Sequence, residues 1–220
     1  MCFSANVSFG AGIVLTVIGV AAIKKARHKT HILFASIPLI FAVQQIAEGF
    51  LWKTIPNPKY QQLQIYFTYI FLLFAQVIWP IWVPISIVLL EKEKTRKLLQ
   101  RILVVAGVLV GSYLGYCLFN YPVLAIIEGS HIKYDLDFPS KPKYFGIILY
   151  AMATVLPPFF SHIKRMWILG VAVSISYIIS NFFYEQYLIS VWCFFASIIS
   201  LSVYIIMVEI NGSQKKMRTI

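Results

Sequence analysis

Long apolar runs separated by short polar segments dominate this chain. Seven stretches carry almost no charge, and each is near the roughly 20 residues that a helix needs to cross about 30 Å of hydrocarbon. They cover residues 1–23, 32–52, 60–90, 102–127, 144–161, 166–184 and 186–208. No sustained alternation of polar and apolar residues, as in a membrane barrel, accompanies them. The pattern predicts an all-α fold, with a single seven-helix membrane domain over residues 1–210 and a short polar tail at 211–220.

The basic residues fall mainly in alternate connections between these runs. Fourteen of the 19 lie near residues 24–29, 92–101, 164–165 and 215–218, and the other five are Lys53, Lys59, Lys133, Lys141 and Lys143. Connections rich in lysine and arginine stay on the cytoplasmic side of a membrane. The N-terminus is therefore expected outside and the C-terminus in the cytoplasm, which agrees with seven crossings.

Composition supports a membrane protein. Hydrophobic residues make up 60% of the 220 residues and charged residues only 12%, whereas soluble domains carry about 25% charged residues. The net charge of +11 comes from short clusters between apolar runs, a pattern that favours an anionic leaflet over nucleic acid. We expect the lipid bilayer as the main partner, no nucleic acid, and a multi-pass protein of the plasma membrane, which is the cytoplasmic membrane in a bacterium.

Glu48 is the only acidic residue inside a predicted span. An ionisable group in hydrocarbon is costly unless it faces a partner, a cavity or water. Gln44, Gln45 and Trp52 lie three or four residues from Glu48, so one helical face combines two amides, an acid and an indole. This face predicts a polar wall inside the bundle. The alternative is a carboxylate that extends to the membrane interface, about 6 Å away along the helix axis.

Three residues on other predicted helices are expected to complete an outward-facing pocket with this face. They are Tyr116, Asn181 and Trp192, each in the outer half of its span. Taken singly, such side chains are more often packing or interfacial residues. Their combination with Glu48 makes a site for a small solute plausible.

Other chemistry finds less support in the sequence. No span contains a lysine or a histidine cluster, so we expect no retinal attachment site and no intramembrane metal site. Nucleotide-binding motifs are absent as well, and we expect no cofactor. Cys2, Cys117 and Cys193 are all expected near the outer side. They could support thiol chemistry beside Glu48, although buried cysteines are more often apolar filler.

The only long connection covers residues 120–143 on the predicted outer side. It mixes acidic and basic residues, and turn formers occur at Gly129-Ser130 and at residues 139–142. We interpret it as a partly ordered lid over the outer face, with a solvated linker as the alternative.

Two short motifs resemble those of an uncharacterised family of bacterial multi-pass membrane proteins. The chain opens with Met-Cys-Phe-Ser-Ala, and the second predicted span contains Gln-Gln-x-x-Glu-Gly-x-x-Trp from Gln44 to Trp52. The resemblance covers about the first quarter of the chain and implies a bacterial membrane protein. It implies no activity.

Three functions from different classes remain open. The first is a protein that binds or carries a small solute through an outward-facing polar pocket centred on Glu48, which could serve as an ion or proton site. The second is an intramembrane enzyme that uses Glu48, with or without a thiol. The third is a membrane sensor or an assembly subunit. We favour the first because it explains both the polar helix face and the prolines within the spans.

Overall fold

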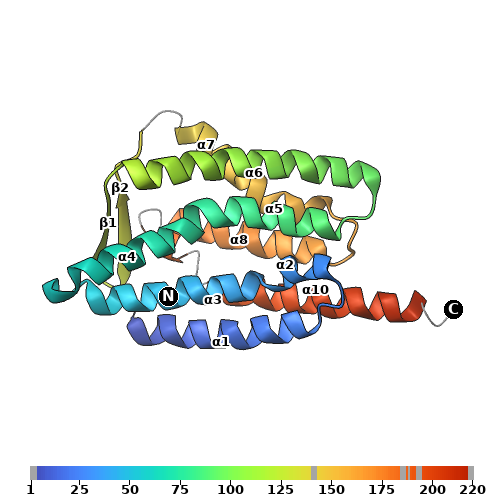
Figure 1. The fold of residues 1–220 in the computed structure, drawn as a ribbon, viewed down its shortest axis with the longest axis horizontal. Coiled ribbons are helices and arrows are strands. Elements are labelled where there is room, and N and C mark those ends of the chain that lie inside the picture. The colour runs from blue at the N-terminus through green and yellow to red at the C-terminus, as the bar shows by residue number, and fades with distance from the viewer. Residues whose placement is uncertain (1–3, 140–142, 184–186, 188, 192–194, 218–220) are drawn as a thin grey trace.

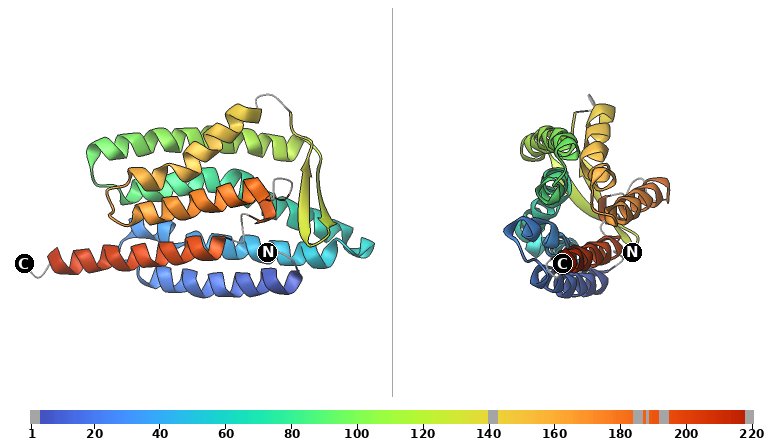
Figure 2. Two further views of the ribbon diagram at one scale, coloured as in Figure 1. Left: turned by 180° about the vertical axis from the view of Figure 1, so that it is seen from behind. Right: turned by 90° about the vertical axis from the view of Figure 1, so that its right-hand side faces the viewer.

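A computed structural model of the protein describes residues 4–139, 143–183, 187, 189–191 and 195–217. Within these ranges the chain is mostly helical, and its helices run side by side along one long axis (Figures 1 and 2). Six helical segments are long and apolar enough to cross a membrane: Ala5–Lys24, Lys29–Thr54, Pro58–Leu90, Lys94–Asn120, Met166–Phe183 and Ile189–Asn211. The protein is therefore a helical membrane protein by length and composition, as expected.

The helices follow one another along the chain with several short interruptions. The described elements are α1 (Ala5–Lys24), α2 (Lys29–Ala35), α3 (Ile37–Thr54), η1 (Pro58–Tyr60), α4 (Gln61–Leu72), the π-helix η2 (Leu73–Ile78), α5 (Trp79–Leu90), α6 (Lys94–Asn120), β1 (Val123–Glu128), β2 (His131–Leu136), α7 (Lys143–Val155), η3 (Pro157–Phe160), α8 (Met166–Phe183) and α10 (Ala196–Met217).

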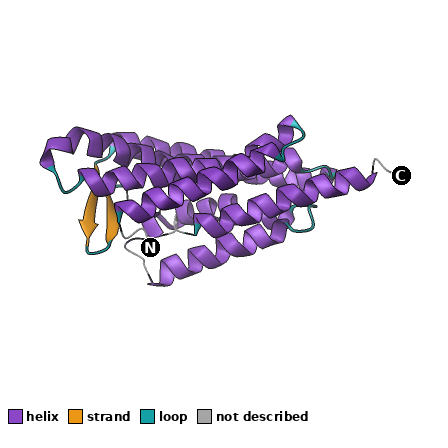
Figure 3. Ribbon diagram, turned by 90° about the horizontal axis from the view of Figure 1, so that it is seen from below, coloured by secondary structure: helices purple, strands orange, loops and turns teal. Residues whose placement is uncertain are grey.

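The two ends of the bundle differ in charge and structure. We call the end that carries β1 and β2 the hairpin end, and Figure 3 shows both strands there. We call the opposite end the basic end. It holds the connections at residues 25–28, 91–93 and 161–165, together with most of the lysines and arginines (Figure 1). The C-terminal part of α10 projects from the basic end.

Prolines explain where the long helical segments change form. Pro38 has no N–H group, and the helix is interrupted at Ser36, between α2 and α3. Pro80 likewise cannot donate to the carbonyl of Gln76, and the wider turns of η2 immediately precede it. The carbonyl of Leu33, beside the first interruption, accepts from the Trp82 indole at 3.0 Å.

The expectation of one helix over residues 102–127 is wrong at its C-terminal end. α6 stops at Asn120, and Val123–Glu128 pairs with His131–Leu136 as an antiparallel hairpin. Pro122 lies two residues after the last residue of α6, and it cannot continue the helix. Gly129 has a φ of +60° at the first position of the two-residue turn, as a tight hairpin turn of type II′ requires. Most of the expected lid or linker at 120–143 is therefore regular structure.

The hairpin is attached to the helices by its buried face. Ile132 and Tyr134 are buried, and the Tyr134 ring stacks on Phe71 of α4 with centroids 4.7 Å apart. The Gln64 side-chain amide donates to the carbonyl of Ala125 at 3.0 Å. These contacts place β2 across one end of the bundle.

The fifth expected span, 144–161, is also shorter in the structure. α7 ends at Val155, and η3 follows after one residue because Pro157 and Pro158 interrupt the helix. The apolar stretch of α7, Gly146–Val155, is below the length of the six candidate spans. Seen from behind in Figure 2, α7 runs obliquely from the hairpin end toward the basic end.

Glycines of α6 allow this helix to pack closely against η2 and the start of α5. A Cβ atom added to Gly107 would lie 1.9 Å from the carbonyl oxygen of Pro80, and one added to Gly111 would lie 3.1 Å from that of Val77. Small residues four apart bring helix backbones together in membranes, where packing replaces the hydrophobic effect. The spacing of Gly107, Gly111 and Gly115 is of this kind.

Gly107→Ala should destabilise the protein, because the obstacle is a backbone carbonyl that no rotamer change can move. We expect a loss of about 1–3 kcal/mol, measured as a lower midpoint of thermal unfolding in detergent. Gly10→Ala is the matched control, since a Cβ at Gly10 meets nothing within 4 Å. An equal effect of both changes would contradict close packing at Gly107.

Candidate functional site

The polar face of α3 lies inside the bundle. Gln44, Gln45 and Glu48 are all buried, with exposed fractions of at most 1%. Trp52, one turn further on, is half-buried and packs against the apolar cluster beneath the hairpin. The alternative prediction, in which the Glu48 carboxylate extends to the membrane interface, does not agree with a side chain that is fully buried among the helices.

Gln44 is held by an aromatic partner on another helix. The indole Nε1 of Trp79 donates to Oε1 of Gln44 at 2.8 Å. Phe41, one turn before Gln44, contacts the same indole with ring centroids 4.0 Å apart. An amide from α3 and an indole from α5 thus form one fixed unit near the middle of the bundle.

Glu48 is held separately, by the segment before α10. The hydroxyl of Ser190 donates to Oε1 of Glu48, and both side chains are fully buried. This bond joins residues 142 positions apart in the chain. It fixes Ser190, and with it the neighbouring Ile189, against α3.

A cavity of about 650 Å³ lies between the helices. Its walls come from α3, η2, α5, α6, β2, α7, η3, α8 and α10, so it extends from the hairpin toward the basic end. The lining side chains that can form hydrogen bonds are Gln44, Gln76, Trp79, Tyr113, Tyr134, Tyr150, Thr154, Tyr177, Asn181 and Tyr187. None of the described lining residues is charged.

The residues expected at the site separate into three groups. Gln44 and Asn181 line the cavity, whereas Gln45, Glu48 and Trp52 are not among its lining residues. Tyr116 is 62% exposed and likewise absent from the lining. Trp192 lies outside the described residues. The cavity is thus organised around Gln44, and Glu48 lies one helical turn beyond it.

Several lining residues did not emerge from the sequence. Tyr134 lies on a strand that was not expected, and Tyr150 and Thr154 lie on α7. Tyr150 and Thr154 are four residues apart and therefore lie on one face of an apolar helix. This spacing could have predicted that both side chains face the interior of the bundle. The Tyr150 hydroxyl donates to the carbonyl of Ala75 in η2 at 2.6 Å, and the Thr154 hydroxyl donates to the carbonyl of Tyr150 at 2.8 Å.

Cys117 carries the one thiol among the described residues. Cys117 is buried in α6 and does not line the cavity, while Cys2 and Cys193 lie outside the described residues. Across the part of the chain that the structure describes, no three His, Cys, Asp or Glu side chains gather as a metal site would require.

The hairpin covers the cavity with a second set of polar contacts. The Tyr187 hydroxyl donates to Oε2 of Glu128 at 3.1 Å, and the ring of Tyr187 stacks on His131 with centroids 4.6 Å apart. The hydrogen bond to the Glu128 carboxylate raises the pKa of Tyr187. Lys133 forms an ion pair with Glu128 at 3.3 Å. β1, β2 and the segment after α8 are thereby joined over the cavity.

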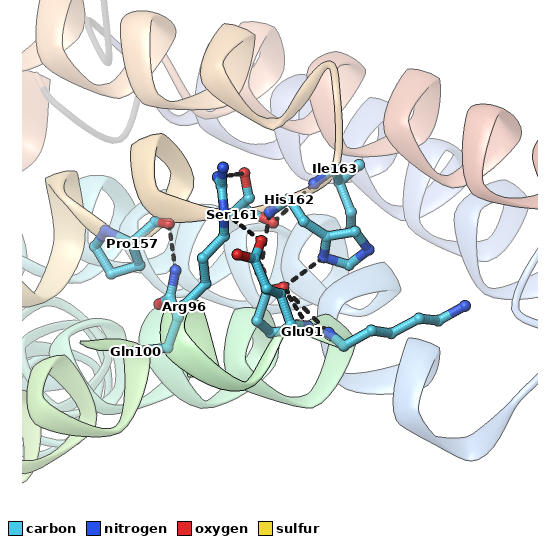
Figure 4. A network of polar contacts seen from close by, with 9 residues as sticks. Glu91, Arg96, Gln100, Pro157, Ser161, His162 and Ile163 are labelled. Carbon is cyan, nitrogen blue, oxygen red and sulfur yellow. Dashed lines mark hydrogen bonds and ion pairs between the residues drawn. The ribbon is translucent and has the colours of Figure 1, made fainter. Parts of the chain in front are cut away.

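A polar network holds the elements together at the basic end (Figure 4). The buried carboxylate of Glu91 accepts from the backbone N–H groups of Lys92 and Glu93, both at 3.1 Å, and from that of His162 at 2.9 Å. The His162 imidazole Nδ1 lies 2.7 Å from the same carboxylate. The connection between α5 and α6 is thus bonded to the connection between η3 and α8.

Two side chains of α6 extend this network toward the cavity. Arg96 donates to the carbonyl of Ser161 at 3.0 Å, and Gln100 donates to the carbonyl of Pro157 at 2.7 Å (Figure 4). The next residue, Pro158, lines the cavity. The network therefore fixes the part of the wall nearest the basic end.

The charge state of Glu91 follows from this environment. Burial by itself raises the pKa of the carboxyl group. The backbone hydrogen bonds from His162 and Glu93, together with the His162 imidazole, outweigh burial, so the pKa of Glu91 lies below its ordinary value. Glu91 is therefore ionised at neutral pH.

Comparison with known proteins identifies a family and no activity. A family model described as a family of unknown function, DUF6629, matches residues 1–218, so the chain belongs to this family. The match covers almost the whole chain and agrees with the expected resemblance to an uncharacterised family. No curated protein and no solved structure matches the chain.

Glu91→Gln should destabilise the protein at neutral pH by about 1–3 kcal/mol, because charge-assisted hydrogen bonds are replaced by weaker ones. A carboxyl group with a lowered pKa in the folded state stabilises above its unfolded pKa and loses this effect as pH falls. The difference between wild type and variant should therefore shrink as the pH falls below about 4.5, the ordinary value for this group.

Thermal unfolding in detergent across a pH series measures this difference. Glu93→Gln is the control, because Glu93 is half exposed and pairs with Arg96 at the surface, where ion pairs contribute little. A constant difference between wild type and Glu91→Gln at every pH would contradict the assigned charge state.

Proposed function

We propose that this protein binds a small, neutral solute in the cavity between its helices, as a membrane carrier or receptor. The single observation that carries the proposal is the cavity of about 650 Å³, which is lined by aromatic and uncharged polar side chains. Ligand pockets usually have volumes of about 300–1,000 Å³ and combine apolar walls with a few polar groups.

The composition of the wall indicates which solutes fit. A bound ion would leave its charge uncompensated in a wall without charged side chains, and this is costly at low dielectric. Aromatic rings such as those of Phe41, Trp79 and Tyr177 offer flat apolar surfaces. The proposed solute is therefore neutral and largely apolar or aromatic.

The form of the wall favours a carrier over a rigid receptor. The π-helix η2 contributes Ala75 and Gln76 to the lining, and Pro158 belongs to η3. Irregular helices occur in membranes where backbone lines a cavity, and π-helical turns are frequent at functional sites. Irregular segments such as η2 and η3 can change conformation with the loss of fewer backbone hydrogen bonds than a regular helix.

Glu48 has a supporting role in this proposal. Its bond to Ser190 holds the cavity-lining Ile189 against α3. That Glu48 itself binds an ion or a proton stays a prediction. An intramembrane enzyme using Glu48 and a thiol has less support, because neither Glu48 nor Cys117 is among the described lining residues. A sensor would use the same cavity without moving the solute.

We also propose that the chain crosses a bacterial cytoplasmic membrane seven times, with α7 and η3 together as the fifth crossing. The basic end would then face the cytoplasm and the hairpin end the outside, because lysines and arginines concentrate at the basic end. The oblique course of α7 in Figure 2 supports this topology.

Filling the cavity should abolish binding. The probe is a neutral dimethylaminonaphthalene dye that carries a propyl group, added to the full-length protein in lipid nanodiscs and followed by quenching of tryptophan fluorescence. Gly146 lines the cavity and has nothing within 4 Å of an added Cβ, so Gly146→Trp should fill the space and remove saturable quenching.

The matched control is Gly10→Trp, which places the same indole at an exposed glycine of α1 with open space around it. It should leave binding of the dye unchanged. If the wild-type protein and Gly146→Trp quench alike, the proposed function is wrong.

Orientation can be tested by cysteine labelling in intact cells, on a background without Cys2, Cys117 and Cys193. A cysteine at Lys25 or Lys94 should resist an impermeant thiol reagent, because both lie at the basic end. A cysteine at Ser130 in the hairpin turn, or at Lys141, should react. The reverse pattern would overturn the proposed orientation.

A further inference from the structure

Most hydrogen-bonding groups of the cavity wall already have partners in the protein. The hydroxyls of Tyr150 and Thr154 donate to backbone carbonyls, and that of Tyr187 donates to Glu128. A ligand cannot take these donors without breaking an existing bond. The groups that remain therefore indicate what the cavity recognises.

Gln44 carries a buried polar group of the wall without such a partner. Its side-chain Nε2 is buried, and no described residue accepts a hydrogen bond from it. A buried donor without an acceptor costs about 1–3 kcal/mol. The same side chain lines the cavity.

The orientation of the Gln44 amide follows from its partner. The indole N–H of Trp79 can only donate, so it must face the amide oxygen, at 2.8 Å. The NH₂ group is then left as a pair of donors on the other side of the amide. Phe41 and Trp79, in contact with each other, fix the position of this pair in an apolar part of the wall.

Resting on the proposed function, we infer that the solute is a neutral carbonyl compound whose oxygen accepts a hydrogen bond from the Gln44 amide. A carbonyl oxygen supplies the missing acceptor. A charged carboxylate would also accept, but no described residue of the wall balances its charge. An alcohol could accept in the same way, but its O–H would compete with Trp79 for the Gln44 oxygen, which already accepts one hydrogen bond.

The test compares two dyes of nearly the same shape. One is the propyl dimethylaminonaphthalene described above, and the other carries a propionyl group in place of the propyl group. The emission of the ketone dye moves to longer wavelength when its carbonyl accepts a hydrogen bond. Affinity and emission are measured on the full-length protein in nanodiscs, with Gly146→Trp as the background.

Gln44→Met keeps the length of the side chain and removes the donors. It should weaken binding of the ketone dye about three- to tenfold, shift the emission of the bound dye to shorter wavelength, and leave binding of the propyl dye unchanged. Gln45→Met is the matched control. It removes the neighbouring buried amide of α3, which is not among the lining residues, and should change neither dye.

Trp79→Phe provides a second variant that keeps Gln44. Without the indole N–H, the amide can rotate and offer its oxygen, so a dye with a hydroxyl in place of the ketone should gain affinity relative to the ketone dye. An unchanged ratio of these two affinities would contradict the assigned role of Trp79.

The possible outcomes separate the two proposals. If both dyes bind the wild type and Gln44→Met with the same affinities, water or another group satisfies Gln44, and the carbonyl inference is wrong while the proposed function stands. If neither dye binds above the Gly146→Trp background, both proposals are overturned. A selective loss of the ketone dye supports both.

Discussion

Polar groups inside hydrocarbon must find their partners within the protein, and this constraint organises the whole bundle. At three points where a helix loses regularity, a side chain from another element bonds a backbone carbonyl. Trp82 does so for Leu33 at the interruption between α2 and α3, and Tyr150 does so for Ala75 in the π-helix. Gln100 bonds the carbonyl of Pro157 in the same way. The irregular segments that shape the cavity are thus also the points that fasten neighbouring helices together.

Gln44 carries a buried donor group that has no acceptor among the described residues. The bundle supplies acceptors and donors to backbone groups far apart in the chain, yet it leaves one buried amide with a fixed orientation and no acceptor among the described residues. Buried polar groups in proteins are nearly always satisfied, and an exception calls for an explanation. The neighbouring Glu48, by contrast, is bonded to Ser190 and supports the wall. Of these two polar residues one turn apart on α3, only Gln44 is among the described lining residues.

The sequence predicted the membrane-spanning character, the positions of most helices and the burial of the polar face of α3, because apolar runs and an intramembrane acid are strong signals. The sequence did not predict the hairpin, because the apolar residues of β1 continue the hydrophobic run of α6. The alternation of Ile132, Tyr134 and Leu136 with polar residues was a sign of β2. The sequence also failed for Tyr116. Helices in lipid are apolar on every side, so composition does not determine which side faces the bundle. The pairing of Gln44 with Trp79 depends on how α3 packs against α5, and spacing within one helix contains no information on this.

The two ends of the bundle are held together by interactions of different strength. At the basic end, an ionised Glu91 accepts four hydrogen bonds. The donors are the backbone N–H groups of Lys92, Glu93 and His162 and the His162 imidazole. Charge-assisted bonds of this kind are roughly twice as strong as neutral ones. At the hairpin end, a single two-stranded ribbon rests on stacked rings and a few side-chain bonds, and an isolated hairpin has little stability of its own. On the proposed function and orientation, the hairpin end would be the end that opens for a solute at the lower cost in free energy.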